Sequence, residues 1–363
     1  MSGMRWHAAI AALILCFGGL SASASGAAAG EAPASTAGLP SSFQWSSSGV
    51  LLSPKSDPTH DIVSVKDPSV VRYGNRWLVY GTTANTAGNW SLFYTSFTDW
   101  SQADSAPLYY LDNSAIGPGY RAAPQVLYFA PQKKWYLVYQ TGLPSYSTTN
   151  DPTRPETWSA PRNFQDTMPD IVRDNIGNGF WLDYWVVCDD QMCYLFSSDD
   201  NGHLYRAETT VKDFPNGFSN TQIVLADANR FALFEASNIY RLKGTNTYLL
   251  LVEAFGSDGR RYFRSWTAQG ITGAWTPLAD TQSNPFARSS NVTFPAGAWT
   301  RDISHGEMIR SGRDQEMEID PGCLQYLYQG VDPAAGGDYS QLPWRLGLLT
   351  QIRDGQTCTP DPD

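Results

Sequence analysis

The sequence predicts an all-β protein, a five-bladed β-propeller, on three observations. Helical periodicity is hard to find, and short apolar and aromatic runs separated by Gly, Asn, Asp and Pro dominate. One pattern recurs five times, at spacings of 56, 60, 52 and 70 residues, which is typical of a repeat architecture. A propeller blade usually holds four antiparallel strands, and five blades fit a chain of this length. A sandwich of unrelated hairpins is the alternative.

Each repeat begins with one head residue, continues as an apolar strand and a polar turn, and ends with a second apolar strand. The units read DPSVVRYGNRWLVYG (67–81), APQVLYFAPQKKWYLVYQTG (123–142), DYWVVCDDQMCYLFSS (183–198), EASNIYRLKGTNTYLLLVEA (235–254) and, from 305 to 330, HGEMIRSGR followed later by CLQYLYQG.

The head residues are predicted to meet in one pocket, because the innermost strands of all blades begin at the same end of the central channel. They are Asp67, Ala123, Asp183, Glu235 and His305.

Three carboxylates at the end of a channel are costly to bury unless they have a function. Like charges held close raise the pKa of some carboxyl groups, and one protonated with one ionised carboxyl is the equipment of a glycosidase. Phe234, beside Glu235, favours Glu235 as the acid with a raised pKa; the ionised partner is Asp67 or Asp183, and spacing does not distinguish them. Taken singly, each of these residues is more often a turn, an edge charge or a structural histidine.

Composition points to a neutral, hydroxyl-rich ligand. The net charge is −10 with no basic cluster, which argues against nucleic acid or an anionic membrane as partner. The 13 Trp and 19 Tyr, with only 17% charged residues, suit a polysaccharide. The alternative is a β core that simply uses aromatic residues.

The N-terminal region reads as a targeting segment. Residues 1–24 have a positive charge at Arg5, an apolar core and a small-residue cleavage site, so they predict a signal peptide and a secreted, extracellular protein. The apolar core is too short for a membrane span. Residues 25–40 are expected to form a low-complexity linker, and residues 41–363 one catalytic domain.

Four cysteines remain after the predicted cleavage, and an even count in an exported protein indicates two disulfides. We expect the pairs Cys188–Cys193, which flank a tight turn, and Cys323–Cys358. A zinc site is the alternative, but no histidine lies at ligand spacing.

The chain resembles the glycoside hydrolase family 62 α-L-arabinofuranosidases. The matching blocks run from about residue 43 to 351 in the family's order. They include FQWSSSGVLLSPK, SVKDPSVVRYGNRWLVYGTTAN, AAPQVLYFAPQKKWYLVYQTG, WLDYWVVCDD, LFEASNIYRLKG, ISHGEMIR and LPWRLGLLT.

The resemblance implies a five-bladed propeller that removes single arabinofuranose branches from arabinoxylan or arabinoxylo-oligosaccharides with inversion. It implies that Asp67 is the general base, Glu235 the general acid, and Asp183 the group that tunes the acid and holds the sugar. The two acting carboxyl groups are then expected roughly 6.5–9.5 Å apart. The pocket is expected to be lined by Lys66, Phe234, Tyr339 and His305.

The resemblance further implies a calcium ion at His305 on the propeller axis, and no organic cofactor. A monomer is expected. Two other functions stay open: a related propeller hydrolase acting on arabinan or xylo-oligosaccharides, and a sugar-binding propeller without catalysis.

Overall fold

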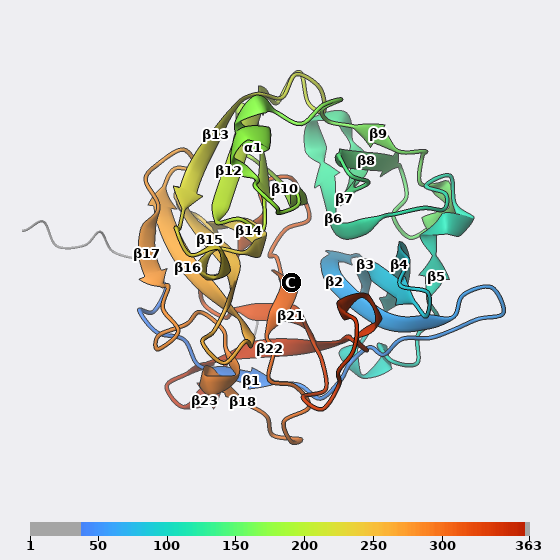
Figure 1. The fold of residues 1–363 in the computed structure, drawn as a ribbon, viewed down its shortest axis with the longest axis vertical. Coiled ribbons are helices and arrows are strands. Elements are labelled where there is room, and N and C mark those ends of the chain that lie inside the picture. The colour runs from blue at the N-terminus through green and yellow to red at the C-terminus, as the bar shows by residue number, and fades with distance from the viewer. Residues whose placement is uncertain (1–37, 360–363) are drawn as a thin grey trace, which may run out of the picture. The chain divides into compact units, whose positions relative to one another are not determined.

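The computed structural model describes residues 38–359, and within this range the strands form five sheets arranged in a ring (Figure 1). The innermost strands β2, β6, β10, β14 and β19 pack against one another around the centre. The predicted fold class, a five-bladed β-propeller, is therefore confirmed. Each repeat unit of the sequence supplies the two inner strands of one blade.

Blades 1 to 3 are four-stranded antiparallel sheets in sequence order. Blade 1 contains β2 (Ile62–Tyr73), β3 (Arg76–Asn85), β4 (Trp90–Phe97) and β5 (Tyr109–Tyr110). Blade 2 contains β6 (Ala122–Phe129), β7 (Lys134–Gln140), β8 (Pro144–Thr149) and β9 (Arg162–Asn163). Blade 3 contains β10 (Leu182–Cys188), β11 (Met192–Ser198), β12 (His203–Thr210) and β13 (Ser219–Ala226).

Blades 4 and 5 depart from this order. Blade 4 contains β14 (Glu235–Leu242), β15 (Thr247–Phe255), β16 (Arg261–Gln269) and β17 (Thr276–Ala279), with β20 (Glu318–Ile319) added in parallel beside β14. Blade 5 contains β19 (Ser304–Met308), β21 (Gln325–Gly330), β22 (Arg345–Arg353), β1 (Trp45–Ser47), β18 (Val292–Thr293) and β23 (Gln356–Thr357).

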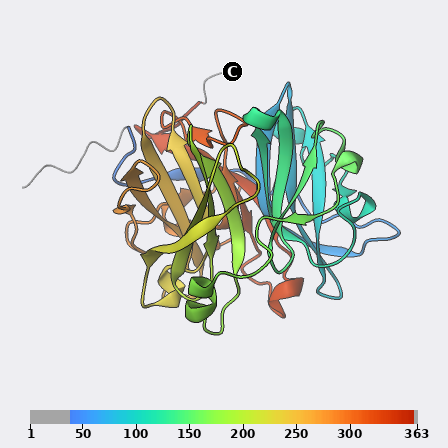
Figure 2. The same cartoon turned by 90° about the horizontal axis from the view of Figure 1, so that it is seen from above.

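Helical segments in the described range are short. They are α1 (Asp170–Asn175) and the 3-10 turns η1 (Trp100–Gln102), η2 (Leu111–Asn113), η3 (Ala130–Gln132), η4 (Pro155–Thr157), η5 (Arg230–Ala232), η6 (Ser289–Asn291) and η7 (Tyr339–Gln341). Figure 2 shows α1, in green, and η7, in red, at the same end of the propeller. None of the helices in residues 38–359 has the length and apolar character that crossing a membrane requires.

The ring is closed by the N-terminal strand. β1 pairs antiparallel with β22, with Trp45 opposite Gln351. The Trp45 indole is fully buried and donates a 2.6 Å hydrogen bond to the Phe286 carbonyl, while Phe43 packs on the Phe286 ring at 4.7 Å. Burial of such large aromatic side chains contributes several kcal/mol, so this contact fastens the start of the domain to its end.

The domain begins slightly before the expected boundary at residue 41. Leu39 is only 4% exposed and belongs to the main hydrophobic core, and Arg353 donates a hydrogen bond to the Gly38 carbonyl. The predicted signal peptide and linker residues 25–37 lie outside the described residues.

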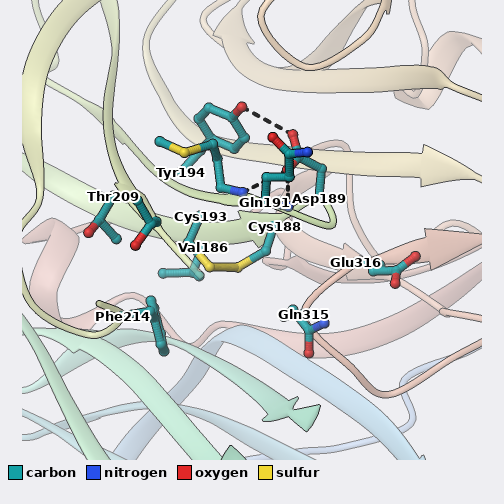
Figure 3. Close-up of a disulfide and its surroundings, with 12 residues drawn as sticks. Val186, Cys188, Asp189, Gln191, Cys193, Tyr194, Thr209, Phe214, Gln315 and Glu316 are labelled. Carbon is teal, nitrogen blue, oxygen red and sulfur yellow. Dashed lines mark hydrogen bonds between the residues drawn. A yellow bond between two sulfur atoms is a disulfide. The ribbon is translucent and has the colours of Figure 1, made fainter. Parts of the chain in front are cut away.

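Both predicted disulfides are confirmed, Cys188–Cys193 and Cys323–Cys358. Figure 3 shows the first, which joins directly opposed residues at the turn between β10 and β11. The Tyr194 hydroxyl donates a hydrogen bond to Asp189 in the same turn (3.1 Å). This turn lies at the far end of β10 from Asp183, so the disulfide fastens the hairpin away from the head residue.

Candidate active site

A cavity of about 1210 Å³ opens where the innermost strands carry their head residues. Its lining includes the predicted catalytic and substrate-binding residues Lys66, Asp67, Asp183, Phe234, Glu235, His305 and Tyr339, whereas the head residue Ala123 is not part of it. Residues separated by more than 270 positions are thus brought to one place by the ring, not by local sequence.

A bulge in each innermost strand turns the head residue toward the cavity. The pairing of inner and second strands shifts register at this point in every blade. The backbone is left-handed at Asp67 (φ 48°), Ala123 (φ 50°) and Asp183 (φ 56°), a conformation that Asp tolerates better than most residues. The bulge re-aims these side chains, which explains an aspartate inside a strand.

Blade 4 corrects the predicted alignment by one residue. Its left-handed position is Ala236 (φ 54°), not Glu235. Glu235 pairs with Glu253 across the sheet, as Lys66 pairs with Thr82 in blade 1, so it occupies the position before the head. Glu235 still reaches the cavity, because positions on both sides of the bulge face it.

Backbone hydrogen bonds hold the heads in place. The head N–H donates to a side chain on the second strand of the neighbouring blade: Asp67 to Gln329 (2.7 Å), Ala123 to Thr82 (2.8 Å), Asp183 to Gln140 (3.0 Å) and His305 to Glu253 (2.7 Å). In blade 4 the Asp183 carboxylate replaces that second-strand acceptor and receives the Ala236 N–H at 2.7 Å. Asp183 is therefore fixed by the backbone of the strand that carries Glu235.

Asp67 lies between two cationic or polar partners. Lys66 Nζ is 3.9 Å from Asp67 Oδ2, and His305 Nδ1 is 3.5 Å from Asp67 Oδ1. The same His305 nitrogen is 3.7 Å from Asp183 Oδ2. His305 thus bridges the two aspartates, which keeps both carboxylates oriented toward the cavity.

Glu235 is held by Arg261, which contacts both Glu235 and Glu253 with one guanidinium nitrogen. Burial raises the pKa of Glu235, but the charge and hydrogen bond of Arg261 outweigh burial, and the pKa lies below its ordinary value. The expectation that Phe234 would give Glu235 a raised pKa is wrong, because the nearby cation dominates the apolar neighbour. Burial raises the pKa of Glu253 to about 7 against the effect of the same Arg261.

Two further carboxyl groups beside Glu235 also have raised pKa values. Burial, followed by the charges of Glu235 and Asp67, raises the pKa of Asp183 well above its usual range. Burial and the charges of Glu235 and Asp183 raise the pKa of Asp200 to about 9. The site therefore holds protonated and ionised carboxyl groups side by side near neutral pH.

Aromatic side chains form the walls of the cavity. Lys66 Nζ lies 3.8 Å from the Trp90 ring centre and donates a 3.2 Å hydrogen bond to the Tyr339 hydroxyl. At the rim, Phe180 is 71% exposed and Tyr120 is 44% exposed. Rings flanking a polar floor suit a sugar, which presents apolar C–H faces and hydroxyl groups.

The protein donors around His305 do not by themselves form a calcium shell. Within residues 38–359 no group of three or more His, Cys, Asp or Glu side chains is arranged to hold a metal ion. Calcium takes six to eight oxygen ligands, whereas His305 Nδ1 already faces Asp67 and Asp183.

Sequence reasoning missed Arg261, Glu253 and Asp200. Glu253 could have been found, because it is a charged residue inside the apolar run LLLVEAF, and buried charged residues are rare. Asp200 lies in the turn between β11 and β12, where Asn201-Gly202 reads only as a hairpin turn. Arg261 begins β16 without any pattern that distinguishes it from a surface arginine.

Comparisons with known proteins agree with this geometry. Residues 44–350 match the model of glycosyl hydrolase family 62. The α-L-arabinofuranosidase C of Cellvibrio japonicus (strain Ueda107) is 46% identical over 321 residues, covering 87% of this chain and 48% of that protein. The chain thus spans about half the length of this curated relative.

Two solved structures share the fold closely. The catalytic domain of the family 62 α-L-arabinofuranosidase of Coprinopsis cinerea is 61% identical with a TM-score of 0.85, covering 86% of this chain and 98% of that one. A family 62 hydrolase solved in complex with xylotriose is 52% identical with a TM-score of 0.83, covering 86% and 98%. The family model covers most of the sequence, and the chain belongs to glycosyl hydrolase family 62.

Proposed function

We propose that the protein is an inverting, exo-acting α-L-arabinofuranosidase that removes single arabinofuranosyl branches from arabinoxylan. The observation that carries the proposal is the convergence of Asp67, Asp183 and Glu235 on one cavity with aromatic walls. The names of two relatives, both α-L-arabinofuranosidases, support the arabinose specificity. The relative solved with xylotriose supports a xylan backbone lying along the cleft.

In this proposal Asp67 is the general base. It takes a proton from a water molecule, whose oxygen attacks the anomeric carbon of the arabinose. Lys66 and His305 stand beside Asp67 and keep its carboxylate oriented. A single displacement of this kind inverts the configuration at the anomeric carbon.

Glu235 is the general acid on the other side of the sugar. It gives a proton to the oxygen of the departing xylosyl unit as the glycosidic bond breaks. Because Arg261 lowers the pKa of Glu235, Glu235 has to receive a proton before it can act. The Ala236 N–H fixes the carboxylate of Asp183 by a hydrogen bond. Asp183 orients the sugar and adjusts the pKa of Glu235.

Secretion, a monomeric state and a calcium ion at His305 remain proposals. Two disulfides support export, because disulfides persist in oxidising compartments. Calcium at His305 would take most of its oxygen ligands from water, since the protein supplies few.

Product analysis tests the function. The protein is incubated with arabinoxylan, debranched arabinan and unsubstituted xylan, and the products are separated and identified. Free arabinose from arabinoxylan alone is expected. Arabinose oligomers or xylose would overturn the proposal, and binding of arabinoxylan without any product would favour a non-catalytic propeller. The anomeric form of the first arabinose released, followed by NMR, tests inversion.

A further inference from the structure

Asp200 is a buried carboxyl group in the cavity that the proposed mechanism does not use. Its side chain is only 7% exposed, it lines the cavity, and its Oδ1 has no hydrogen-bond partner among the described residues. A buried polar atom without a partner destabilises the folded protein. A group placed at such a cost beside the reacting atoms calls for a function.

The turn that carries Asp200 is rigid. The Asp199 carboxylate accepts hydrogen bonds from the backbone N–H groups of Asn201 (2.8 Å) and His203 (3.1 Å). A side chain on Gly179 would come within 1.9 Å of the Asp199 carbonyl oxygen, so the loop before β10 packs directly on the turn. Asp200 is therefore held at one position relative to Glu235.

Asp200 and Glu235 line the same cavity, and the charge of Glu235 contributes to the raised pKa of Asp200. Two carboxylates held close repel each other, so one of the two groups keeps a proton. Arg261 stabilises Glu235 as the carboxylate, so the proton resides on Asp200.

We propose that Asp200 holds the proton that Glu235 delivers to the departing oxygen, so that the two carboxyl groups act as one proton-carrying pair. This inference rests on the proposed function. When the sugar binds, the proton moves from Asp200 to Glu235 and then to the glycosidic oxygen as the bond to the anomeric carbon breaks. Water attacks that carbon and loses its proton to Asp67. After turnover Asp67 releases a proton to solvent and Asp200 takes one up.

Asp200 acts through Glu235, so it is a positioning residue, and its signature is in the pH profile. The pKa of about 9 for Asp200 means that the pair keeps its proton at neutral pH. Without the Asp200 carboxyl the proton must reside on Glu235, whose pKa Arg261 lowers. Activity would then be lost at lower pH. The charged or titratable groups that face the pair are Lys66, Asp183, Glu253, Arg261 and His305.

The test compares two substrates in Asp200→Asn. Asn tolerates the left-handed backbone of position 200 (φ 53°) and keeps an N–H donor there, but carries no exchangeable acid proton. On arabinoxylan at pH 8 we expect kcat/KM to fall about 10- to 100-fold, with the alkaline limb moved to lower pH. On 2,4-dinitrophenyl α-L-arabinofuranoside, whose leaving group needs no proton, we expect a change of less than about threefold.

The outcomes separate the possibilities. An equal loss on both substrates would assign Asp200 to sugar binding or folding, and an unmoved alkaline limb would remove it from proton transfer; either overturns the inference. No arabinose from either substrate with wild-type protein would instead refute the proposed function. Asp190→Asn, in the exposed turn at the opposite end of the β10–β11 hairpin, is the matched control and should leave both profiles unchanged.

If Asp200→Asn does not fold, the wild-type profile still decides. An alkaline limb below about pH 6 on arabinoxylan would show that the pair does not keep its proton, and the inference fails.

Discussion

Replacing Arg261 by Met should destabilise the protein strongly, and more at pH 8 than at pH 5. Met keeps much of the apolar stem but removes the charge that pairs with Glu235 and Glu253. The side chains are 9%, 15% and 0% exposed, so water cannot replace the lost partner. Breaking one side of such a buried pair costs about 3–5 kcal/mol.

The sign of the pH dependence follows from the two carboxyl groups. The pKa of Glu235 is lowered by Arg261, so in the wild type its stabilising effect is present above the unfolded-state pKa and is lost as pH falls through the folded-state pKa. In the variant the largest effect that opposes burial is gone, and Lys66 and His305 oppose it less than Arg261 does, so the pKa of both groups rises. At pH 5 both carboxyl groups bind protons and become neutral, which removes the buried charges. At pH 8 the groups either stay charged without a partner or bind protons that are scarce in solution, and both alternatives destabilise the folded state.

Urea unfolding followed by tryptophan fluorescence at pH 5 and pH 8 measures this. A loss of about 3–5 kcal/mol corresponds to a fall of about 1 M or more in the midpoint for an m value of about 3 kcal/mol/M. Arg154→Met is the control, because its pair with Glu156 is exposed and screened by water; its midpoint should match the wild type. A pH-independent loss, or none, would refute the pairing as described.

Three further predictions concern catalysis and the framework. Asp67→Asn and Glu235→Gln should each lower kcat on arabinoxylan by about 10²- to 10⁴-fold; a circular dichroism spectrum like the wild type's and less than a tenfold loss would contradict the assigned role. Replacing Cys323 and Cys358 by Ala should cost about 4 kcal/mol in urea unfolding, against about 2 kcal/mol for the disulfide in blade 3, because the bridged segments span 35 and 5 residues; equal losses would contradict the chain-entropy argument. Asn291→Asp should lower thermal stability by about 1–3 kcal/mol, since its amide donates to three backbone carbonyls that a carboxylate repels; an unchanged melting temperature would count against those bonds.

The fold was predictable because blades repeat. Asp67, Ala123 and Asp183 share a backbone conformation, and that common geometry produces the recurring pattern in the sequence. Glu235 was aligned to the same position although Ala236 holds it. A bulge makes such an error easy, because it adds one residue to the strand. The functional side chain can then lie at the left-handed position or at the position before it.

The site was only partly predictable. Asp67, Asp183 and Glu235 could be found, since acids beside apolar strands are conspicuous, whereas Glu253 and Asp200 were missed. Arg261 could not be found, because its partners lie on two neighbouring strands and its exposure is decided by the tertiary fold. Its charge also reverses the pKa expected for Glu235 from the apolar neighbour Phe234. Whether burial or a nearby charge determines a pKa depends on distances between atoms, which a sequence does not contain.

The pairing of β1 with β22 has a consequence for how the protein is made. The two strands are about 300 residues apart in the chain, and bringing them together costs roughly 5 kcal/mol of loop-closure entropy. β1 gains its antiparallel partner β22 only after residues 345–353 have been synthesised, whereas its parallel partner β18 begins at Val292. β1 therefore has no partner strand until residue 292 has been synthesised, and its full pairing in blade 5 requires residues up to 351. A chain that ended before β22 would leave β1 with only the short parallel partner β18.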